Sequence, residues 1–307
     1  MSIQRTLEEA LSRCRKTAAQ GKVATYIPEL GKADPSALAV AVCDLQGNLF
    51  EAGDLETKVT LQSISKVASL VLALQILGEE KVFAHVGVEP TADPFNSIMR
   101  LEMVQPHRPQ NPLINAGAIV VLSLLPYTKS SERFEAVRDL MRDLTGNSRM
   151  DVDEAVYISE KQTSDRNRSL TYFLRSVRAF EGDIEDILDT YFRQCGVSCV
   201  CRDLAVMGAT LANNGVNPLT GKKVVPDRIC VIVRALMGTC GLYDGSGEFA
   251  LKVGIPAKSG VGGGIMAAVP GVMGVSAIGP ALDSKGNSVA GMAVLETLSR
   301  ELDLRRL

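Results

Sequence analysis

The chain has 307 residues and a formal net charge of −2, with 46% hydrophobic and 22% charged residues. This composition is typical of a soluble globular protein with a sizeable core, arranged as one large domain or two modest ones. The near-neutral charge, without long runs of like charge, argues against nucleic acid as the main partner.

The first 20 residues have the pattern of an amphipathic helix and lack the apolar core of a signal peptide. No apolar stretch reaches about 18 residues without a charge, so we expect no membrane span. Seven cysteines at scattered spacings, without a secretory signal, indicate reduced thiols and a cytoplasmic location. Three of them stand in "CGVSCVC" (195–201), an unusual spacing for zinc, so we expect neither a metal nor a cofactor.

The first third of the chain predicts a helix, a hairpin and a second helix. Residues 25–36, "TYIPELGKADPS", form a loop after the first helix. Two β-rich runs within 38–54 flank a turn at 44–48 and predict the hairpin. The run 61–77, "LQSISKVASLVLALQIL", carries Lys66 as its one charge and predicts a buried helix.

From about residue 78 to 201 the pattern is helical, interrupted by a proline-rich loop at 104–117. Residues 201–215 predict one more helix, ended by Gly215. Residues 249–302 then predict three strands separated by Gly/Pro turns, a turn at 283–288 and a final helix.

This order predicts an α/β fold of the α+β type. We expect an antiparallel five-stranded sheet flanked by the N- and C-terminal helices, with an all-helical subdomain inserted. Residues 1–62 and 203–307 are expected to form the sheet subdomain and residues 63–202 the helical one, with the active site in the cleft between them.

Ser63 and Lys66 are the first residues whose pattern indicates chemistry. Residues three apart share a helix face, and the positive end of a helix favours an alkoxide or oxyanion. Burial disfavours a charged lysine, so Lys66 can accept the serine proton. The alternative is a capped core helix whose lysine reaches water. His85 and His107 stand in contexts that do not favour either as the base of a serine enzyme.

A second motif, "AKSGVGGG", follows far downstream at 257–264. S-x-x-K followed by K-[ST]-G is the pattern of serine β-lactamases and penicillin-binding proteins. The N–H of Val261, directly after this K-S-G triplet, would pair with the N–H of Ser63 to hold an oxyanion. The alternative for Lys258 is a strand lysine in solvent.

The flanking residues resemble the bacterial-type serine-dependent glutaminases. The resemblance rests on eight blocks in the family's order, running from about Tyr26 to the C-terminal helix: "TYIPEL", "LQSISKV", "NPLINAGAI", "SEKQTSDRN", "DTYFRQC", "TLANNG", "CGLYDGSGEFA" and "GIPAKSGVGGGI". It implies a β-lactamase-like fold, hydrolysis of L-glutamine to L-glutamate and ammonia through an acyl-enzyme, and assembly as a homodimer or homotetramer.

The resemblance also implies the site residues. The nucleophile would be Ser63 and its base Lys66, with Tyr26 beside the nucleophile, Tyr243 as a proton relay and Val261 in the oxyanion hole. The implied substrate-binding residues are Ser63, Asn115, Glu160, Asn167, Tyr191, Tyr243 and Val261.

The chemistry of these side chains suits a free amino acid. Glu160 offers an anion to the ammonium, while asparagine amides and tyrosine hydroxyls offer donors to the carboxylate. Taken singly, Asn115 also fits a helix cap, Glu160 a solvated helix residue and Tyr191 an ordinary core residue. One alternative function is a penicillin-recognising serine hydrolase or peptidase, although no S-D-N triplet is present. The other is a non-catalytic amino-acid-binding protein of the same fold.

Overall fold

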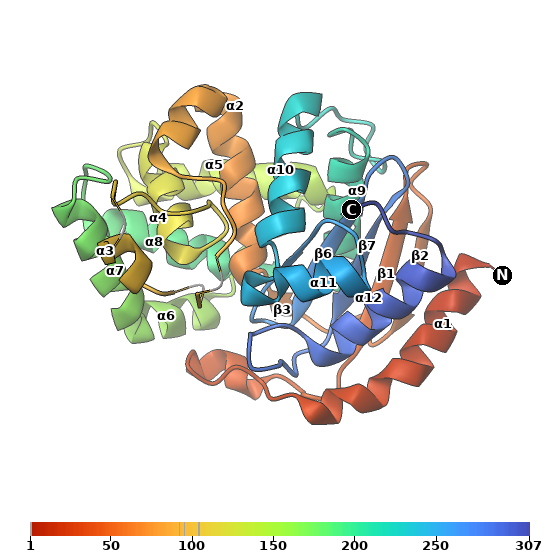
Figure 1. Ribbon diagram of the computed structural model, residues 1–307. Coiled ribbons are helices and arrows are strands. Elements are labelled where there is room, and N and C mark those ends of the chain that lie inside the picture. The colour runs from red at the N-terminus through yellow and green to blue at the C-terminus, as the bar shows by residue number, and fades with distance from the viewer. Residues whose placement is uncertain (1, 92, 95, 104) are drawn as a thin grey trace.

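A five-stranded antiparallel sheet lies in one half of the molecule (Figure 1). The computed structural model describes residues 2–91, 93–94, 96–103 and 105–307, so the predicted loop 104–117 begins outside the described residues. The strand order is β2-β1-β7-β6-β5, which confirms the predicted five-stranded sheet. The strands are β1 (Ala39–Asp44), β2 (Leu49–Gly53), β5 (Ala257–Ser259), β6 (Gly264–Val269) and β7 (Met273–Ile278).

Helices cover both faces of this sheet. They are α1 (Ile3–Cys14) and α12 (Val289–Glu301) on one face and α9 (Cys201–Ala212) on the other. Successive residues of a strand point to opposite faces, so Val40 joins the core under α1 and α12 while Ala41 joins the core under α9. Because both faces are buried, the strands are almost continuously apolar.

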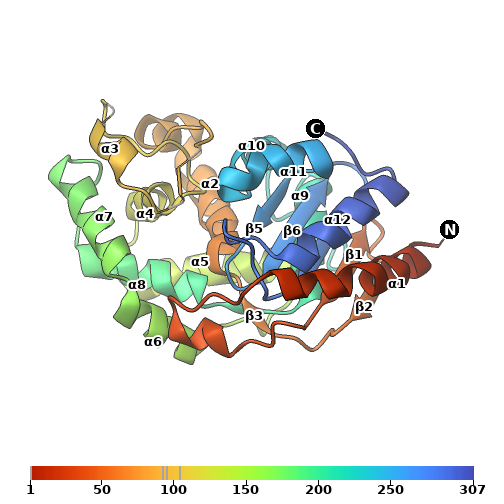
Figure 2. The same ribbon diagram turned by 60° about the horizontal axis from the view of Figure 1, so that its bottom comes forward.

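The second half of the molecule is helical and lies beside the sheet in both views (Figures 1 and 2). Its helices are α2 (Ser65–His85), α3 (Met99–Met103), α4 (Asn115–Leu124), α5 (Ser130–Thr145), α6 (Glu154–Thr163), α7 (Asp165–Ser176) and α8 (Ile184–Cys195). These helices come after β2 and before β5 in the chain. An all-helical part is therefore inserted in the sequence of the sheet, as predicted. The exact bounds 1–62, 63–202 and 203–307 stay a prediction.

The segment that carries Ser63 differs from the continuous helix predicted over 61–77. Residues Gln62–Ile64 form a 3-10 turn, α2 begins at Ser65, and the helix runs on to His85 through a break at Gly78, where φ is 79°. A small two-stranded sheet precedes this turn: β3 (Val59–Thr60) pairs with β4 (Ser198–Cys199).

Two further helices lead into β5. α10 (Asp227–Cys240) packs against α2, and α11 (Ser246–Lys252) follows a 3-10 turn at Tyr243–Gly245. Within the described residues no single helix is long and apolar enough to cross a membrane; α10 together with residues 243–252 passes that test only as a pair bent by 87°.

Candidate active site

Ser63 lies in the 3-10 turn directly before α2, between the sheet and the helical half. Its side chain is almost fully buried, and its hydroxyl is hydrogen-bonded to Tyr243. The preceding residue, Gln62, has a φ of 48°, in the left-handed region that side chains other than glycine rarely adopt. Such strain persists only where the surroundings hold it and is typical of functional sites.

The K-S-G motif reaches Ser63 because two glycines allow a close backbone approach. A Cβ atom on Gly260 would lie 2.4 Å from the carbonyl oxygen of Leu61, and one on Gly262 would lie 2.5 Å from that of Thr60. Val261, between them, therefore lies beside the serine turn and lines the same cavity. Within the described part of the chain, the N–H groups of Ser63 and Val261 have no hydrogen-bond acceptor, so both are available to an oxyanion.

Lys66 is fully buried behind the serine. Its Nζ donates to Asn115 Oδ1 at 2.6 Å and to the Leu113 carbonyl at 3.4 Å. It also lies 6.0 Å from the centre of the Tyr191 ring. Burial lowers the pKa of Lys66 to about 8, although the nearby Cys195 and Glu160 act in the other direction. A large fraction of this amine is therefore neutral near pH 8.

Tyr243 reaches Ser63 from a strained turn in which its own φ is 56°. The hydroxyl donates to the Ser259 carbonyl at 3.3 Å and is hydrogen-bonded to Ser63. Burial raises the pKa of Tyr243, so the phenol stays protonated at neutral pH. The ring packs with Ile27 and Val261, which ties the loop after Tyr26 to the site.

Glu160 is a buried carboxylate on α6. Burial raises the pKa of Glu160 to about 8, against the lowering effects of the Gln62 amide and the Lys66 charge. Gln62 Nε2 lies 3.4 Å from Glu160 Oε2. The interpretation of Glu160 as a solvated helix residue is excluded, because its side chain is only 4% exposed.

Asn115 and Asn167 connect two helices at the site. Asn115 is the first residue of α4, but its side chain does not cap that helix: Oδ1 accepts from Lys66 and Nδ2 donates to Asn167 Oδ1 at 2.9 Å. Asn167 is on α7. The lysine, Asn115 and Asn167 thus form one chain of hydrogen bonds from the protein interior to the cavity.

These side chains surround one cavity of about 70 Å³. Of the nine residues predicted from the sequence, seven line it: Tyr26, Ser63, Asn115, Glu160, Asn167, Tyr191 and Val261. Lys66 and Tyr243 lie behind this wall and touch it through the hydrogen bonds above. Tyr26, 56% exposed, is at the mouth.

Several residues that line the cavity were not predicted from the sequence. Gln62 and Cys195 are part of the wall, and Arg166 lies at the rim, where its Nε donates to the Asn96 carbonyl at 3.0 Å. Gln62 directly precedes Ser63 in the sequence, and this position could have indicated that it lines the cavity. Lys258 is fully buried, so its interpretation as a strand lysine in solvent is wrong.

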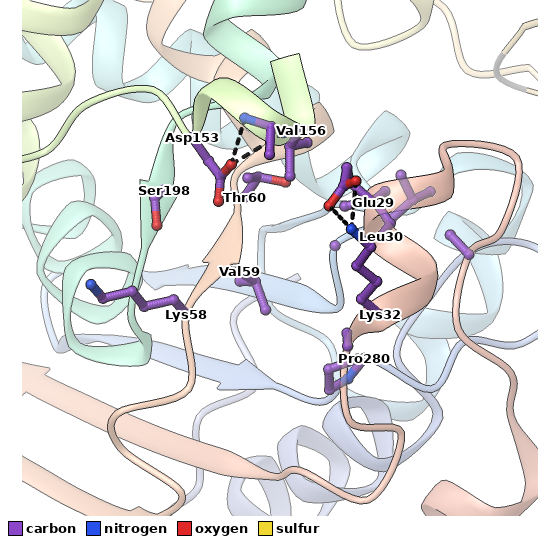
Figure 3. Close-up of a pocket in the computed structure, with 15 residues that line it drawn as sticks. Glu29, Leu30, Lys32, Lys58, Val59, Thr60, Asp153, Val156, Ser198 and Pro280 are labelled. Atoms are coloured by element: carbon purple, nitrogen blue, oxygen red, sulfur yellow. Dashed lines mark hydrogen bonds and ion pairs between the residues drawn. The ribbon is translucent and has the colours of Figure 1, made fainter. Parts of the chain in front are cut away.

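A second cavity, of about 240 Å³, has Lys58, Thr60 and Ser198 among its lining residues (Figure 3). Lys32 and Glu29 form an ion pair at its edge, and Asp153 caps the first turn of α6 there. Val261 belongs to the walls of both cavities, while Ser63 belongs only to the smaller one. Among the described residues, no group of three or more His, Cys, Asp or Glu side chains is arranged to hold a metal ion.

Comparison with known proteins gives consistent matches. The family model described as "Glutaminase" matches residues 21–306. A glutaminase from Clostridium tetani is 52% identical over 302 residues, 98% of this chain and 99% of the relative, and one from Clostridium botulinum (strain Loch Maree) is 50% identical over the same shares.

Solved structures match over the whole chain as well. The Bacillus subtilis glutaminase in covalent complex with 5-oxo-L-norleucine is 37% identical, with a TM-score of 0.91 and 100% of both chains covered. A Bacillus glutaminase in 4.3 M NaCl is 38% identical, with a TM-score of 0.93 and the same coverage. These matches confirm the predicted β-lactamase-like fold.

Proposed function

This chain belongs to the glutaminase family, and from that premise we propose that it hydrolyses L-glutamine to L-glutamate and ammonia through an acyl-enzyme on Ser63. The observation that carries the proposal is the meeting of Ser63, Lys66, Tyr243 and a free Val261 N–H around one cavity with a buried carboxylate. Family membership favours this activity over both alternatives, the penicillin-recognising hydrolase and the non-catalytic binding protein.

Substrate binding follows from charge. The α-ammonium of glutamine needs an anion, and Glu160 is the carboxylate in the cavity wall. The α-carboxylate needs donors, and the amides of Asn115 and Asn167 and the hydroxyl of Tyr191 offer N–H and O–H groups there. Because these groups are buried, a ligand that leaves them unpaired is rejected.

Acylation begins when the Ser63 Oγ attacks the carbonyl carbon of the side-chain amide. Lys66, neutral in part near pH 8, takes the serine proton. The N–H groups of Ser63 and Val261 hold the oxyanion, and losing one such donor costs roughly 10²–10³ in rate. The Tyr243 phenol, which burial keeps protonated, gives a proton to the departing ammonia. Tyr243, now a phenolate, or Lys66 after it has passed the serine proton to Tyr243, then takes a proton from the water that releases glutamate.

The direct test is ammonia and glutamate release from L-glutamine by the purified protein, with Ser63→Ala as the inactive variant. Ser65→Ala is a matched control, because Ser65 is a buried serine two residues away whose hydroxyl donates to the Gln62 carbonyl at 2.6 Å. Equal ammonia release from wild type and Ser63→Ala would overturn the mechanism. Calorimetric glutamine binding without turnover by the wild type would instead support a binding protein.

We further propose a homodimer or homotetramer in the cytoplasm. Family resemblance supports the assembly, and the free state of all seven cysteines is compatible with a reducing compartment. Sedimentation velocity at micromolar concentration tests the assembly: a single monomer peak would contradict it.

A further inference from the structure

Two charged side chains line the substrate cavity, and the proposed reaction uses one of them. Of the residues that line this cavity in the described part of the chain, only Glu160 and Arg166 carry a charge. Glu160 is proposed to bind the ammonium of glutamine. Lys66 lies behind the wall, where Asn115 and the Leu113 carbonyl accept its N–H groups. Arg166 is therefore the cation among these lining residues that the reaction leaves without a function.

A break between two helices brings the two charges to one cavity. Glu160 is in α6 and Arg166 is the second residue of α7, and the chain breaks between these helices at Ser164. In an unbroken helix, residues six apart would point about 120° away from each other, because successive residues are rotated by about 100°. The break removes this constraint, and Ser164 lines the cavity together with both charged residues. An anion and a cation therefore face the same small cavity.

The guanidinium of Arg166 is only partly occupied by the protein. Its Nε donates to the Asn96 carbonyl at 3.0 Å, and Asn96 also lines the cavity. Within the described residues, no carboxylate forms an ion pair with Arg166, and neither Nη atom has a hydrogen-bond acceptor. Another arginine of α7 differs, because Arg168 forms an ion pair with Glu185 at 3.0 Å. The Asn96 carbonyl thus holds the guanidinium of Arg166 at the rim and leaves both Nη groups to bind an anion.

A neutral donor follows Arg166 directly in the chain. Asn167 uses its side-chain oxygen to accept from Asn115 Nδ2 at 2.9 Å. In the part of the chain that the structure describes, the amide nitrogen of Asn167 has no acceptor, so its N–H groups are available. A carboxylate can accept two hydrogen bonds from a guanidinium and has further lone pairs for an amide. Successive residues of α7 can therefore supply a charged and a neutral donor to one carboxylate.

We propose that Arg166 binds the α-carboxylate of glutamine at the rim of the cavity while Glu160 binds the ammonium. This inference rests on the proposed function and adds a charged partner to the neutral donors named there. A free α-amino acid carries one positive and one negative group, and the lining residues carry one charge of each opposite sign. An amide without the carboxylate loses the Arg166 contact and leaves the cation unpaired, so Arg166 contributes to specificity for amino acids.

A matched pair of substrates tests this. γ-Aminobutyramide is glutamine without its α-carboxylate, and it keeps the ammonium and the amide. A hydrogen bond to a charged group contributes about a factor of ten or more to affinity, so Arg166→Gln should raise KM for glutamine about tenfold. Because the amide that reacts is not touched, kcat should stay within about twofold, and so should KM for γ-aminobutyramide. Ammonia release gives these constants; where γ-aminobutyramide turns over too slowly, its inhibition constant against glutamine replaces KM. Equal increases for the two substrates, or an unchanged KM for glutamine, would overturn the inference.

Arg168→Gln is the matched control, because Arg168 lies two residues along the same helix, pairs with Glu185 and is not among the residues that line the cavity. A rise in its KM for glutamine as large as that of Arg166→Gln would also overturn the inference. Arg166→Lys keeps the charge but not the planar fork, so its KM should lie between those of the wild type and Arg166→Gln. A KM above that of Arg166→Gln would exclude a role for the charge. Loss of ammonia release in the wild type itself would instead overturn the proposed function.

Discussion

Lys66 Nζ lies 2.6 Å from the side-chain oxygen of Asn115, and the amide of Asn115 in turn donates to Asn167. The proposed base is therefore held by a neutral acceptor rather than by a carboxylate. A neutral acceptor stabilises the charged form of the amine less than a carboxylate would, so burial outweighs the opposing effects of Cys195 and Glu160 and lowers the pKa of Lys66.

Exchanging that neutral acceptor for an anion should impair the base. In Asn115→Asp a carboxylate beside the amine favours the ammonium, so the pKa of Lys66 rises, by about 1–3 units for a close opposite charge. The limb of kcat/KM that depends on the neutral amine should move to higher pH by that amount, as measured by ammonia release from pH 6 to 10. Asn167→Asp is the control, because its charge is one hydrogen bond farther from the amine and should shift the limb less. Equal shifts would contradict the assigned geometry.

The pH dependence of kcat/KM in the wild type is set by two groups, Lys66 and Glu160, which must both lose a proton before they can act. Lys66, with its pKa lowered to about 8, is an effective base only when deprotonated, and Glu160, with its pKa raised to about 8, is an anion only when deprotonated. Below pH 8 both groups hold protons that the reaction needs removed. The value of kcat/KM should therefore rise with pH up to about 8 and fall again at higher pH, where the ammonium of glutamine that Glu160 binds loses its own proton. A flat profile between pH 6 and 8 would contradict both assignments.

Glu160→Gln isolates the contribution of the carboxylate to substrate binding. Breaking a buried ion pair by removing one partner costs about 3–5 kcal/mol, or roughly 10² to several times 10³ in affinity, so glutamine binding should weaken by that factor. The matched substrate is glutaramate, which is glutamine without its α-amino group, and its acylation should change little. Calorimetry gives the binding constants and ammonia release gives the rates. Equal losses for both substrates would show that Glu160 does not recognise the ammonium.

Residue order and short motifs predicted the sheet and the helical part. The nine site residues come from the family resemblance, and their roles stay a prediction, although seven of them line one cavity. What the motifs did not predict depends on contacts between distant segments. The burial of Lys258 is decided by how Gly241 and Tyr243 pack against β5. The left-handed φ of Gln62 has no signal in the local pattern either: Gln62 follows β3, a strand of two residues whose partner β4 lies far along the chain.

The exact ends of the helices could not be predicted from the periodicity either. The stretch 153–177 has helical periodicity throughout, yet α6 ends before Ser164, where ψ is 41°, and α7 begins directly after it. No proline or glycine marks this break. The break lies between Glu160 and Asn167, on the two helices that present these side chains to the cavity.

Close packing of α9 on the sheet gives a stability prediction that is independent of the reaction. A Cβ atom on Gly208 would lie 2.3 Å from the Ala267 carbonyl oxygen, closer than any real contact, so Gly208→Ala forces α9 away from β6. Overpacking of this kind costs about 1–3 kcal/mol, and the thermal midpoint should fall by several degrees. Gly247→Ala is the matched control: it also lies in a helix, α11, but its Cβ would meet nothing within 4 Å. In Gly247→Ala the gain in helix propensity should add up to about 1 kcal/mol to the free energy of unfolding. The thermal midpoint should therefore stay unchanged or rise. A Gly208→Ala midpoint at or above that of Gly247→Ala, measured by differential scanning calorimetry, would show that α9 does not approach the sheet as closely as described.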